Sequence, residues 1–286
     1  MKISKFFFVA AFMTASSLTA FSQKTTLRFQ PANGSQYTCK TTTKTTVLQE
    51  VMGQKMEIIS NSLIANTYNI KDAGTNKDLK TTIDSISTRA SAMGNEIILS
   101  SENDDESSKP MRDIKGKSYT ATVTPLGKIE KVTGMDELVN ASEGNNDISK
   151  MFSKDALTQM ASQSFRFYPE NAVNVGDTWT TNSQITTPVA INTKNTYKLL
   201  KIDNDIATLE VSGDLATDGE VKTINQGMEV IMTLSGTQSG TMKVNIKNGI
   251  PISSNIKQDM KGTTKVMGME IPLTVINDVS FICTPK

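Results

Sequence analysis

The fold is decided by residues 252–283, ISSNIKQDMKGTTKVMGMEIPLTVINDVSFIC, where apolar and polar side chains alternate on both sides of Gly268. Before this glycine, Ile256 and Met260 fall on one face of an extended chain and Lys257 falls on the other. After it, the odd-numbered positions are mostly apolar and the even-numbered ones mostly polar. Because strand side chains alternate between faces, the pattern predicts two long antiparallel strands, each with one apolar face, joined by a hairpin turn.

The same hairpin pattern recurs elsewhere in the chain. VMGQKMEI at 51–58 resembles VMGMEI at 266–271, and GMEV at 227–230 repeats its centre. GSQYT at 34–38 and GDTWT at 176–180 share a Gly-x-x-aromatic-Thr pattern. These similarities predict an internal repeat in two halves, both built from long hairpins.

Turn residues and composition extend this prediction to the whole fold. Further turns are expected at 124–127, 203–205 and 247–250. Arms of about 14 residues would give strands of roughly 45 Å, which need a second layer or closure into a curved wall. The 37 threonines among 286 residues also favour strands. We expect a mainly β fold, in which long antiparallel hairpins form a curved sheet or half-barrel with a short helical connector.

Helix is expected only within residues 135–164. A short helix is predicted at 135–139, and Asp147 could cap a second one. The second helix would have an apolar stripe made of Ile148, Met151, Phe152, Ala156 and Met160. The expected organisation is a signal peptide at 1–22, a first β half at 23–133, a helical connector at 134–170 and a second β half at 171–286, with both halves in one structural unit.

The amino-terminal residues have the pattern of a secretory signal. Lys2 and Lys5 precede an apolar run at 6–13, and small residues at 20–22 suggest cleavage before Gln23. An uncleaved anchor is the alternative. Later segments lack a run of 18 apolar residues, so we expect no transmembrane segment in the mature chain and a soluble exported protein, periplasmic or extracellular.

Export makes the two cysteines interpretable, because oxidising compartments permit disulfides. Cys39 and Cys283 both fall on the apolar faces of their expected strands. This placement is compatible with a bond that ties the two ends of the chain together. Two unpaired buried thiols are the alternative.

Composition excludes several classes of function. The chain has no histidine, which removes Ser-His-Asp and Cys-His catalytic sites and His-based zinc sites. Lys and Arg number 30 against 29 Asp and Glu, so no overall charge favours nucleic acid. The acidic run at 102–106 lacks the spacing and glycine of a calcium loop and is expected to be a solvated loop. No cofactor, metal site or catalytic residue is predicted, which favours a protein that is not an enzyme.

A ligand-lining face is the main functional hypothesis. Its candidate residues lie on the apolar faces of the first and last hairpins: Met56, Ile58, Ile64, Met260, Met269 and Leu273. Serines, amides and threonines, among them Gln258 and Thr264, interrupt these faces, which suggests water or a ligand beside them. Methionine adapts to ligands of different shape. An ordinary core is one alternative. Another is a Cu(I) site of methionine thioethers, because Met267 and Met269 share a strand face and Met52 lies close to Met56.

Around Gly176, Asp177 and Trp179 the sequence resembles a family of exported bacterial proteins of unknown function with a G-D-x-W motif. That family implies no catalytic residues. The long hairpins and helical connector are also similar in architecture to half-barrel lipoprotein carriers of the bacterial envelope, which hold acyl chains against a concave sheet.

The leading hypothesis is an exported, non-enzymatic binding protein of the bacterial envelope that holds an apolar or amphipathic small molecule on a concave β-sheet. The alternative is a structural or protein-interaction module with a closed core, whose partner would be another envelope protein.

Overall fold

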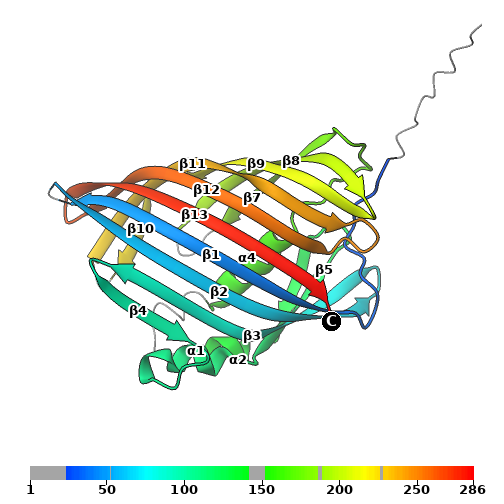
Figure 1. Cartoon of the computed structure of the whole chain (residues 1–286), viewed down its shortest axis with the longest axis horizontal. Coiled ribbons are helices and arrows are strands. Elements are labelled where there is room, and N and C mark those ends of the chain that lie inside the picture. The colour runs from blue at the N-terminus through cyan, green and yellow to red at the C-terminus, as the bar shows by residue number, and fades with distance from the viewer. Residues whose placement is uncertain (1–23, 52, 142–151, 186–188, 226–227) are drawn as a thin grey trace, which may run out of the picture.

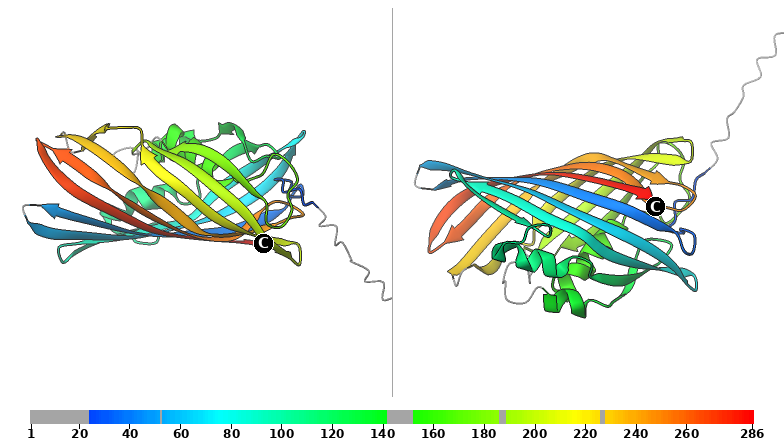
Figure 2. Two further views of the ribbon diagram at one scale, coloured as in Figure 1. Left: turned by 90° about the horizontal axis from the view of Figure 1, so that it is seen from above. Right: turned by 60° about the horizontal axis from the view of Figure 1, so that its bottom comes forward.

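The computed structural model describes residues 24–51, 53–141, 152–185, 189–225 and 228–286. In these ranges, thirteen antiparallel strands form one curved sheet that does not close into a barrel (Figures 1 and 2). The prediction of a mainly β protein with long antiparallel hairpins is therefore confirmed. The expected signal peptide lies outside the described residues.

The strands are β1 (Gln36–Val51), β2 (Gln54–Ala73), β3 (Asn76–Ala92), β4 (Asn95–Ser100), β5 (Ser118–Val123), β6 (Ile129–Thr133), β7 (Thr178–Ile185), β8 (Ile191–Asp203), β9 (Ile206–Thr217), β10 (Val221–Asn225), β11 (Met228–Asn245), β12 (Pro251–Val266) and β13 (Met269–Pro285). The helices are η1 (Glu106–Ser108), α1 (Lys109–Ile114), α2 (Asp136–Ala141) and α4 (Lys154–Ser164).

The first and last strands are neighbours in the middle of the sheet. Its order is β6-β5-β3-β2-β1-β13-β12-β11-β9-β8-β7, with β4 beside β3 and β10 beside β11. Strands from the amino-terminal side of the connector thus lie on one side of the β1–β13 pair, and strands from its carboxyl side lie on the other. The division into repeated halves at residues 133 and 171 stays a prediction.

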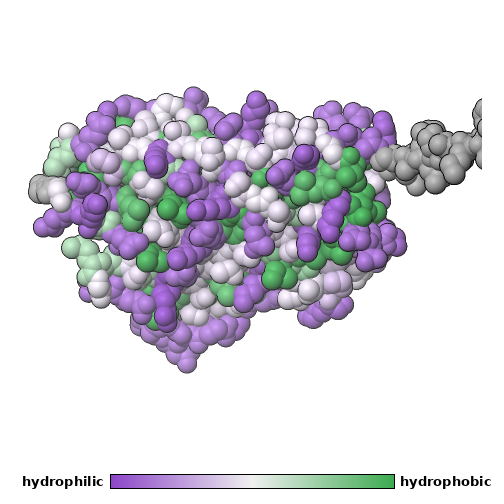
Figure 3. Space-filling model, turned by 45° about the horizontal axis from the view of Figure 1, so that its top comes forward, coloured by the Kyte–Doolittle hydropathy of each residue, from purple (hydrophilic) through white to green (hydrophobic). Residues whose placement is uncertain are grey.

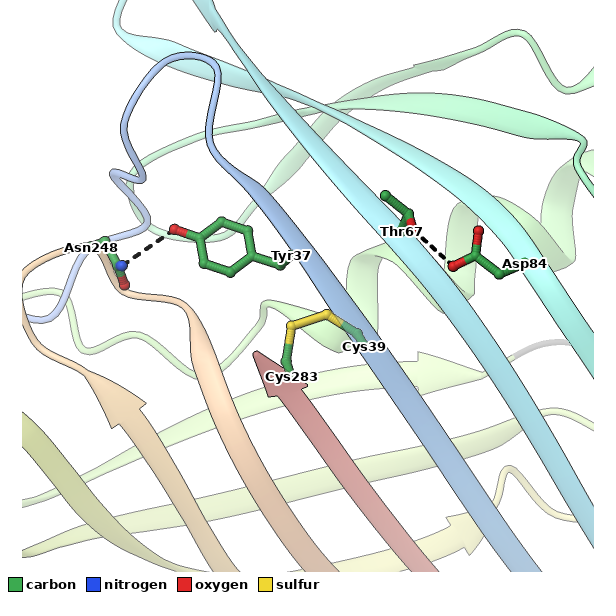
Figure 4. The surroundings of a disulfide bond; sticks show 6 residues. All are labelled: Tyr37, Cys39, Thr67, Asp84, Asn248 and Cys283. Atoms are coloured by element: carbon green, nitrogen blue, oxygen red, sulfur yellow. Dashed lines mark hydrogen bonds between the residues drawn. A yellow bond between two sulfur atoms is a disulfide. The ribbon is translucent and has the colours of Figure 1, made fainter. Parts of the chain in front are cut away.

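Cys39 and Cys283 form a disulfide across the β1–β13 pair. They are directly opposite in the register, with Cα atoms 4.0 Å apart. Beside them, the Asn248 side chain donates a hydrogen bond to the Tyr37 hydroxyl at 3.3 Å (Figure 4). The disulfide is therefore part of the buried interior, and it joins residues 244 positions apart in sequence.

The two faces of the sheet differ in polarity. Burial alternates along β1, where Tyr37 and Cys39 are buried and Lys40 and Lys44 are exposed. The convex face carries the lysines and acidic residues of the central strands, and hydrophilic residues are spread over the view in Figure 3. The concave face holds the core, and α4 lies on that side (Figure 2).

One end of the curved sheet is closed by the chain itself. We call it the closed end; it is the end where β1 begins and β13 finishes. Leu27 and Phe29, which precede β1, are fully buried there. Phe29 donates its backbone N–H to the Pro125 carbonyl at 2.8 Å, and its ring packs on Phe165 with centroids 4.9 Å apart. The opposite end, which we call the open end, is where β1, β3 and β12 finish and where β2, β4, β11 and β13 begin (Figure 1).

The connector differs in part from its prediction. Helix α2 covers the first expected helix, but α4 is capped by Ser153, whose hydroxyl accepts the Ala156 N–H at 3.2 Å. Phe152 and Ala156 of the expected stripe are buried. The proposed cap Asp147 and the stripe residues Ile148 and Met151 lie outside the described residues, and the Met160 side chain is not described.

The prediction that helix is confined to 135–164 is wrong, because η1 and α1 lie in the first half. The side chain of Asp105 accepts the backbone N–H of Ser108 at 2.8 Å, which caps this turn. A hydrogen bond from the Ser107 hydroxyl, together with the one from the Ser108 backbone N–H, lowers the pKa of Asp105 to about 2. Met111 and Ile114 are buried beneath. The acidic run at 102–106 thus includes a helix start within an otherwise exposed segment.

Replacing both cysteines with serine should lower the free energy of unfolding by about 5 kcal/mol, because the disulfide closes a very long loop in the unfolded chain. Urea unfolding of the oxidised protein, with and without reductant, measures the change. The double variant serves as the control and should not respond to reductant. An unchanged midpoint for the reduced wild type would contradict this expectation.

A substitution at Gly249 should be more harmful than one at another turn glycine. Gly249 has φ +75°, and a Cβ there would lie 1.9 Å from the Arg28 carbonyl oxygen; Gly74 has φ +67° and open space around it. We expect Gly74→Ala to lower stability by about 1 kcal/mol and Gly249→Ala by at least about twice that. Chemical denaturation of both variants tests the difference. Equal losses of stability would show that the closed end can rearrange to accommodate the added methyl group, which contradicts the expectation.

Candidate binding face

The concave face is uncharged along the central strands. The register places Cys39 and the other odd residues of β1 and β13 on this face, with the even residues of β2, β12 and β11. Among the described residues, the single charged side chain at these inward positions is Asp72, which is exposed near the closed-end terminus of β2, beyond its pairing with β1. The other charged side chains on these strands alternate onto the convex face, so a molecule against the paired part of the concave face would meet only apolar and neutral polar groups.

A row of polar side chains crosses the middle of this face. Thr45 donates its hydroxyl to Asn277 Oδ1 at 2.8 Å, and Asn277 Nδ2 donates to Gln258 Oε1 at 2.9 Å. Gln258 Nε2 donates to Gln238 Oε1 at 2.9 Å, and Gln238 Nε2 donates to Asn195 Oδ1 at 2.5 Å. We call this row the amide ladder. It links β1, β13, β12, β11 and β8.

The last step of the amide ladder passes over β9, where Gly213 has no side chain. Gly213 is the register partner of both Gln238 and Asn195. A Cβ at this position would lie 2.5 Å from Asn195 Oδ1. Glycine therefore leaves room for the Gln238 amide to reach the next strand but one.

A second buried apolar group lies on the open-end side of the ladder. We call it the outer apolar group; its members are Leu215, Val230, Leu234, Met260 and Leu273. Their side chains are 2–8% exposed, yet they are not part of the continuous core at the closed end. The concave face thus has two apolar zones with hydrogen-bonded amides between them.

A polar group without a partner lies within the outer zone. Thr264 is 6% exposed, and its Oγ1 is buried and makes no hydrogen bond. Its register partners are Ile271 and Met232, both on inward positions. An unsatisfied buried hydroxyl is costly, and native proteins normally pair it with protein, water or ligand. The Thr264 hydroxyl therefore has a hydrogen-bonding capacity that no described residue meets.

The structure separates the six candidate lining residues. Met56, Ile58, Met260, Met269 and Leu273 lie on the open-end side of the ladder. Ile64 lies on the closed-end side and packs against the main core. Contact of these six residues with a ligand stays a prediction.

Sequence reasoning missed most of the amide ladder. Gln258 was among the expected polar positions, whereas Thr45, Gln238, Asn195 and Asn277 were not. The sequence did contain a signal for them, because each is a polar residue at an inward position of a strand whose side chains alternate between faces. Their alignment into one row depends on strand order and register, which the alternation does not reveal.

The Gly-Asp-x-Trp segment has a structural role. Gly176 donates its N–H to the Leu199 carbonyl at 2.7 Å, and the Asp177 carbonyl accepts the Leu199 N–H at 3.0 Å. Asp177 Oδ2 also accepts the Asn174 N–H at 2.8 Å. These bonds fasten the turn that leads into β7.

Trp179 fixes the connector to the sheet. Its Nε1 donates to the Phe167 carbonyl at 2.7 Å, and its ring stacks on Tyr197 with centroids 5.8 Å apart. Tyr168 donates its hydroxyl to the Gly249 carbonyl at 2.6 Å. Burial raises the pKa of both tyrosines, so they stay neutral at ordinary pH. This aromatic cluster closes the end of the sheet.

The described residues contain no group of three His, Cys, Asp or Glu side chains placed to hold a metal ion. The described helices include none with the length and apolar character needed to cross a membrane. Met267 and Met269, which the sequence suggested as thioether ligands, are 80% and 45% exposed at the open end. Met52 lies outside the described residues.

Fold and face together define an open antiparallel β half-barrel with an uncharged concave surface. Residues 74–251 match the model of a family of unknown function, DUF6263. The match covers more than half of the chain and includes the Gly-Asp-x-Trp segment, and the chain belongs to this family. No curated protein matches the sequence.

Among the solved structures that resemble this chain, a lipovitellin structure is similar in fold. This structure, which describes lipid–protein interactions, has a TM-score of 0.55 at 8% identity, covering 90% of this chain and 25% of that one. The chain therefore spans about a quarter of that protein. An outer membrane channel from Pseudomonas putida F1 (9% identity, 90% and 98% covered) and OccK5 from Pseudomonas aeruginosa (8% identity, 89% and 98% covered) have TM-scores of 0.25 and 0.22. Scores this low establish no common fold.

Breaking the amide ladder at its centre should destabilise the protein. Gln258→Met would leave Asn277 Nδ2 and Gln238 Oε1 without partners, at a cost of about 1–3 kcal/mol. Lys257→Met on the exposed convex face is the matched control, with a change within about 0.5 kcal/mol. Guanidinium unfolding of the two variants gives the comparison. If both changes are equally mild, the ladder contributes no measurable stability.

Proposed function

We propose that this chain is an exported, non-enzymatic binding protein of the bacterial envelope that holds an apolar or amphipathic molecule on the open half of its concave face. The observation that carries the proposal is the outer apolar group, which lies apart from the core and contains an unpartnered buried hydroxyl at Thr264. Domains usually have one contiguous core, and buried hydroxyls usually have hydrogen-bond partners.

The chemistry of the face favours an uncharged ligand surface. Its groups are aliphatic and thioether side chains, with amides and hydroxyls at the ladder and at Thr264. A charged group placed here would find no counter-ion and would lose its hydration. An acyl chain with an ester, amide or hydroxyl group matches these properties. The fold likeness to lipovitellin, whose structure describes lipid–protein interactions, supports this class.

The available reactive groups support binding rather than catalysis. Histidine is absent from the sequence. The buried tyrosines are held neutral by raised pKa values, and the described inward positions on the open-end side of the amide ladder carry no carboxylate or lysine. These features leave no general base on the candidate face.

Two features support export. Residues 1–22 have the pattern of a secretory signal. The Cys39–Cys283 disulfide suits an oxidising compartment such as the periplasm or the cell exterior.

The alternative is a protein-interaction module, and one surface favours it. Strand β4 is paired to β3 and exposes Ile97 and Ile98, which are 62% and 42% accessible. Apolar residues on a short strand can add to a partner's sheet or surface. The alternative predicts that a partner protein, and no small amphiphile, occupies the molecule.

Binding of the fluorescent apolar probe N-phenyl-1-naphthylamine tests the proposal. We expect micromolar binding by the wild type, and about tenfold weaker binding by Met260→Gln, which places a polar amide in the outer apolar group. Asp259→Gln, on the adjacent convex position, is the matched control and should bind like the wild type. Circular dichroism and unfolding midpoints confirm that both variants are folded.

If Met260→Gln is unstable, Thr264→Val provides a second test of the proposed function. Removing an unpartnered hydroxyl should raise the stability of the ligand-free protein by about 1 kcal/mol. Native mass spectrometry should then show weaker binding of monoacylglycerol, which has hydroxyl groups, with no loss for a simple alkane. No binding of probe or monoacylglycerol by the wild type would reject the proposed function.

A further inference from the structure

The hairpin turns at the two ends of the sheet use different residues. At the closed end, β8 and β9 are joined by Asn204-Asp205, and β11 and β12 by a turn with Asn248. At the open end, β3 and β4 are joined by Met93-Gly94, and β12 and β13 by Met267-Gly268. Asn and Asp are the usual residues before glycine in such turns, because they tolerate a positive φ.

The methionines in these turns are unfavourable for stability on two counts. Met93 has φ 51° and Met267 has φ 50°, in the left-handed region that long side chains rarely adopt. Their side chains are 78% and 80% exposed, so packing does not offset the strain. Asparagine at either position would relieve the backbone and would remove apolar surface from water. A feature that is strained and exposed at two separate turns points to a function.

Other apolar side chains surround these turns. Met228, which begins β11, and Met269, which begins β13, are 42% and 45% exposed. We call Met93, Met228, Met267 and Met269 the methionine rim. All four lie at the end of the sheet opposite the carboxyl terminus (Figure 1). The rim borders the open half of the concave face, on the same side of the amide ladder as Met260 and Leu273.

The charges behind the rim are paired. Arg89 lies 3.6 Å from Glu96 on the β3–β4 hairpin, and Lys222 lies 3.2 Å from Glu229 on the β10–β11 hairpin. Lys265 lies 3.0 Å from Glu220. These three basic side chains each have an acidic partner, and Lys55 on the β1–β2 hairpin is opposite Glu50 in the register, so positive and negative charges near the rim are balanced.

We propose that the methionine rim docks the open end of the sheet onto an uncharged lipid surface. Separate apolar tips on splayed hairpins form a fringe rather than a continuous flat patch (Figure 2). Such a fringe suits a deformable surface that each tip enters independently, whereas a protein partner would need complementary pockets at every tip. Paired charges behind the tips fit a zwitterionic bilayer.

This inference goes beyond the proposed function and does not depend on it. The rim side chains are at the turns, and the outer apolar group is inside the face. Docking would bring the open half of the concave face to the lipid, so an amphiphile could pass between them without crossing water. Docking can nevertheless occur if nothing binds inside.

Sedimentation with vesicles of pure phosphatidylcholine tests the docking. The wild type should partition onto these vesicles, and the Met93→Asn/Met267→Asn double variant should partition at least about tenfold less. The double variant should also have an unfolding midpoint at least as high as the wild type, because asparagine tolerates the positive φ of these turns. Ile282→Asn, which removes an exposed apolar side chain of β13 near the closed end, is the matched control and should bind like the wild type.

Two results would overturn the proposal. One is equal vesicle binding by the wild type and the double variant, or none by either. The other is binding that requires about 20% phosphatidylglycerol, which would indicate a charge-driven contact. The naphthylamine probe should bind the double variant normally, since its concave face is intact. If the wild type binds the vesicles but does not bind the probe, the proposed function is rejected and the rim proposal stands.

Discussion

The pairing of β1 with β13 is the constraint on which the rest of the structure depends. It joins the first strand to the last in the middle of one sheet, so each later hairpin extends outward from a shared centre. The long register from Tyr37 to Gln49 fixes which residues face inward across the adjoining strands. The Cys39–Cys283 disulfide holds this register near its closed end, and the amide ladder crosses it through Thr45 and Asn277. A slip of one residue would turn the apolar face outward and separate both links.

Local alternation was enough to predict the strands and their inward faces, but it could not predict their order. The pattern of 252–283 gave the last hairpin with its turn at Gly268, and it placed Cys283 inward. Helix α1 was missed because its start follows an acidic run that resembled a loop, although Asp105 and Pro110 are helix-start residues. Strand order is set by contacts between distant segments, and these leave no local periodicity.

For the candidate face too, local alternation predicts which side chains face inward, but contacts between distant segments decide which of them lie together. Parity placed Met260, Leu273 and Ile64 on the inward face, but Ile64 packs against the main core and the other two lie in the outer apolar group. What separates them is their position along the strands relative to the amide ladder. That position depends on how strands align, which residue types alone do not encode. The Gly-Asp-x-Trp segment likewise marked an important place, but its role is to fasten the connector to the closed end.

The contrast between the two ends has a mechanical consequence. At the closed end, the aromatic cluster, the residues before β1 and the disulfide bind the strands into one rigid block. Beyond the amide ladder, described side chains such as Leu234 and Met260 are outside that block. Backbone hydrogen bonds between neighbouring strands hold much of this part together. Bending of antiparallel strands preserves these bonds, because a sheet can change its twist and curvature without breaking them. The strands at the open end can therefore bend apart and widen the concave face while the closed end stays folded.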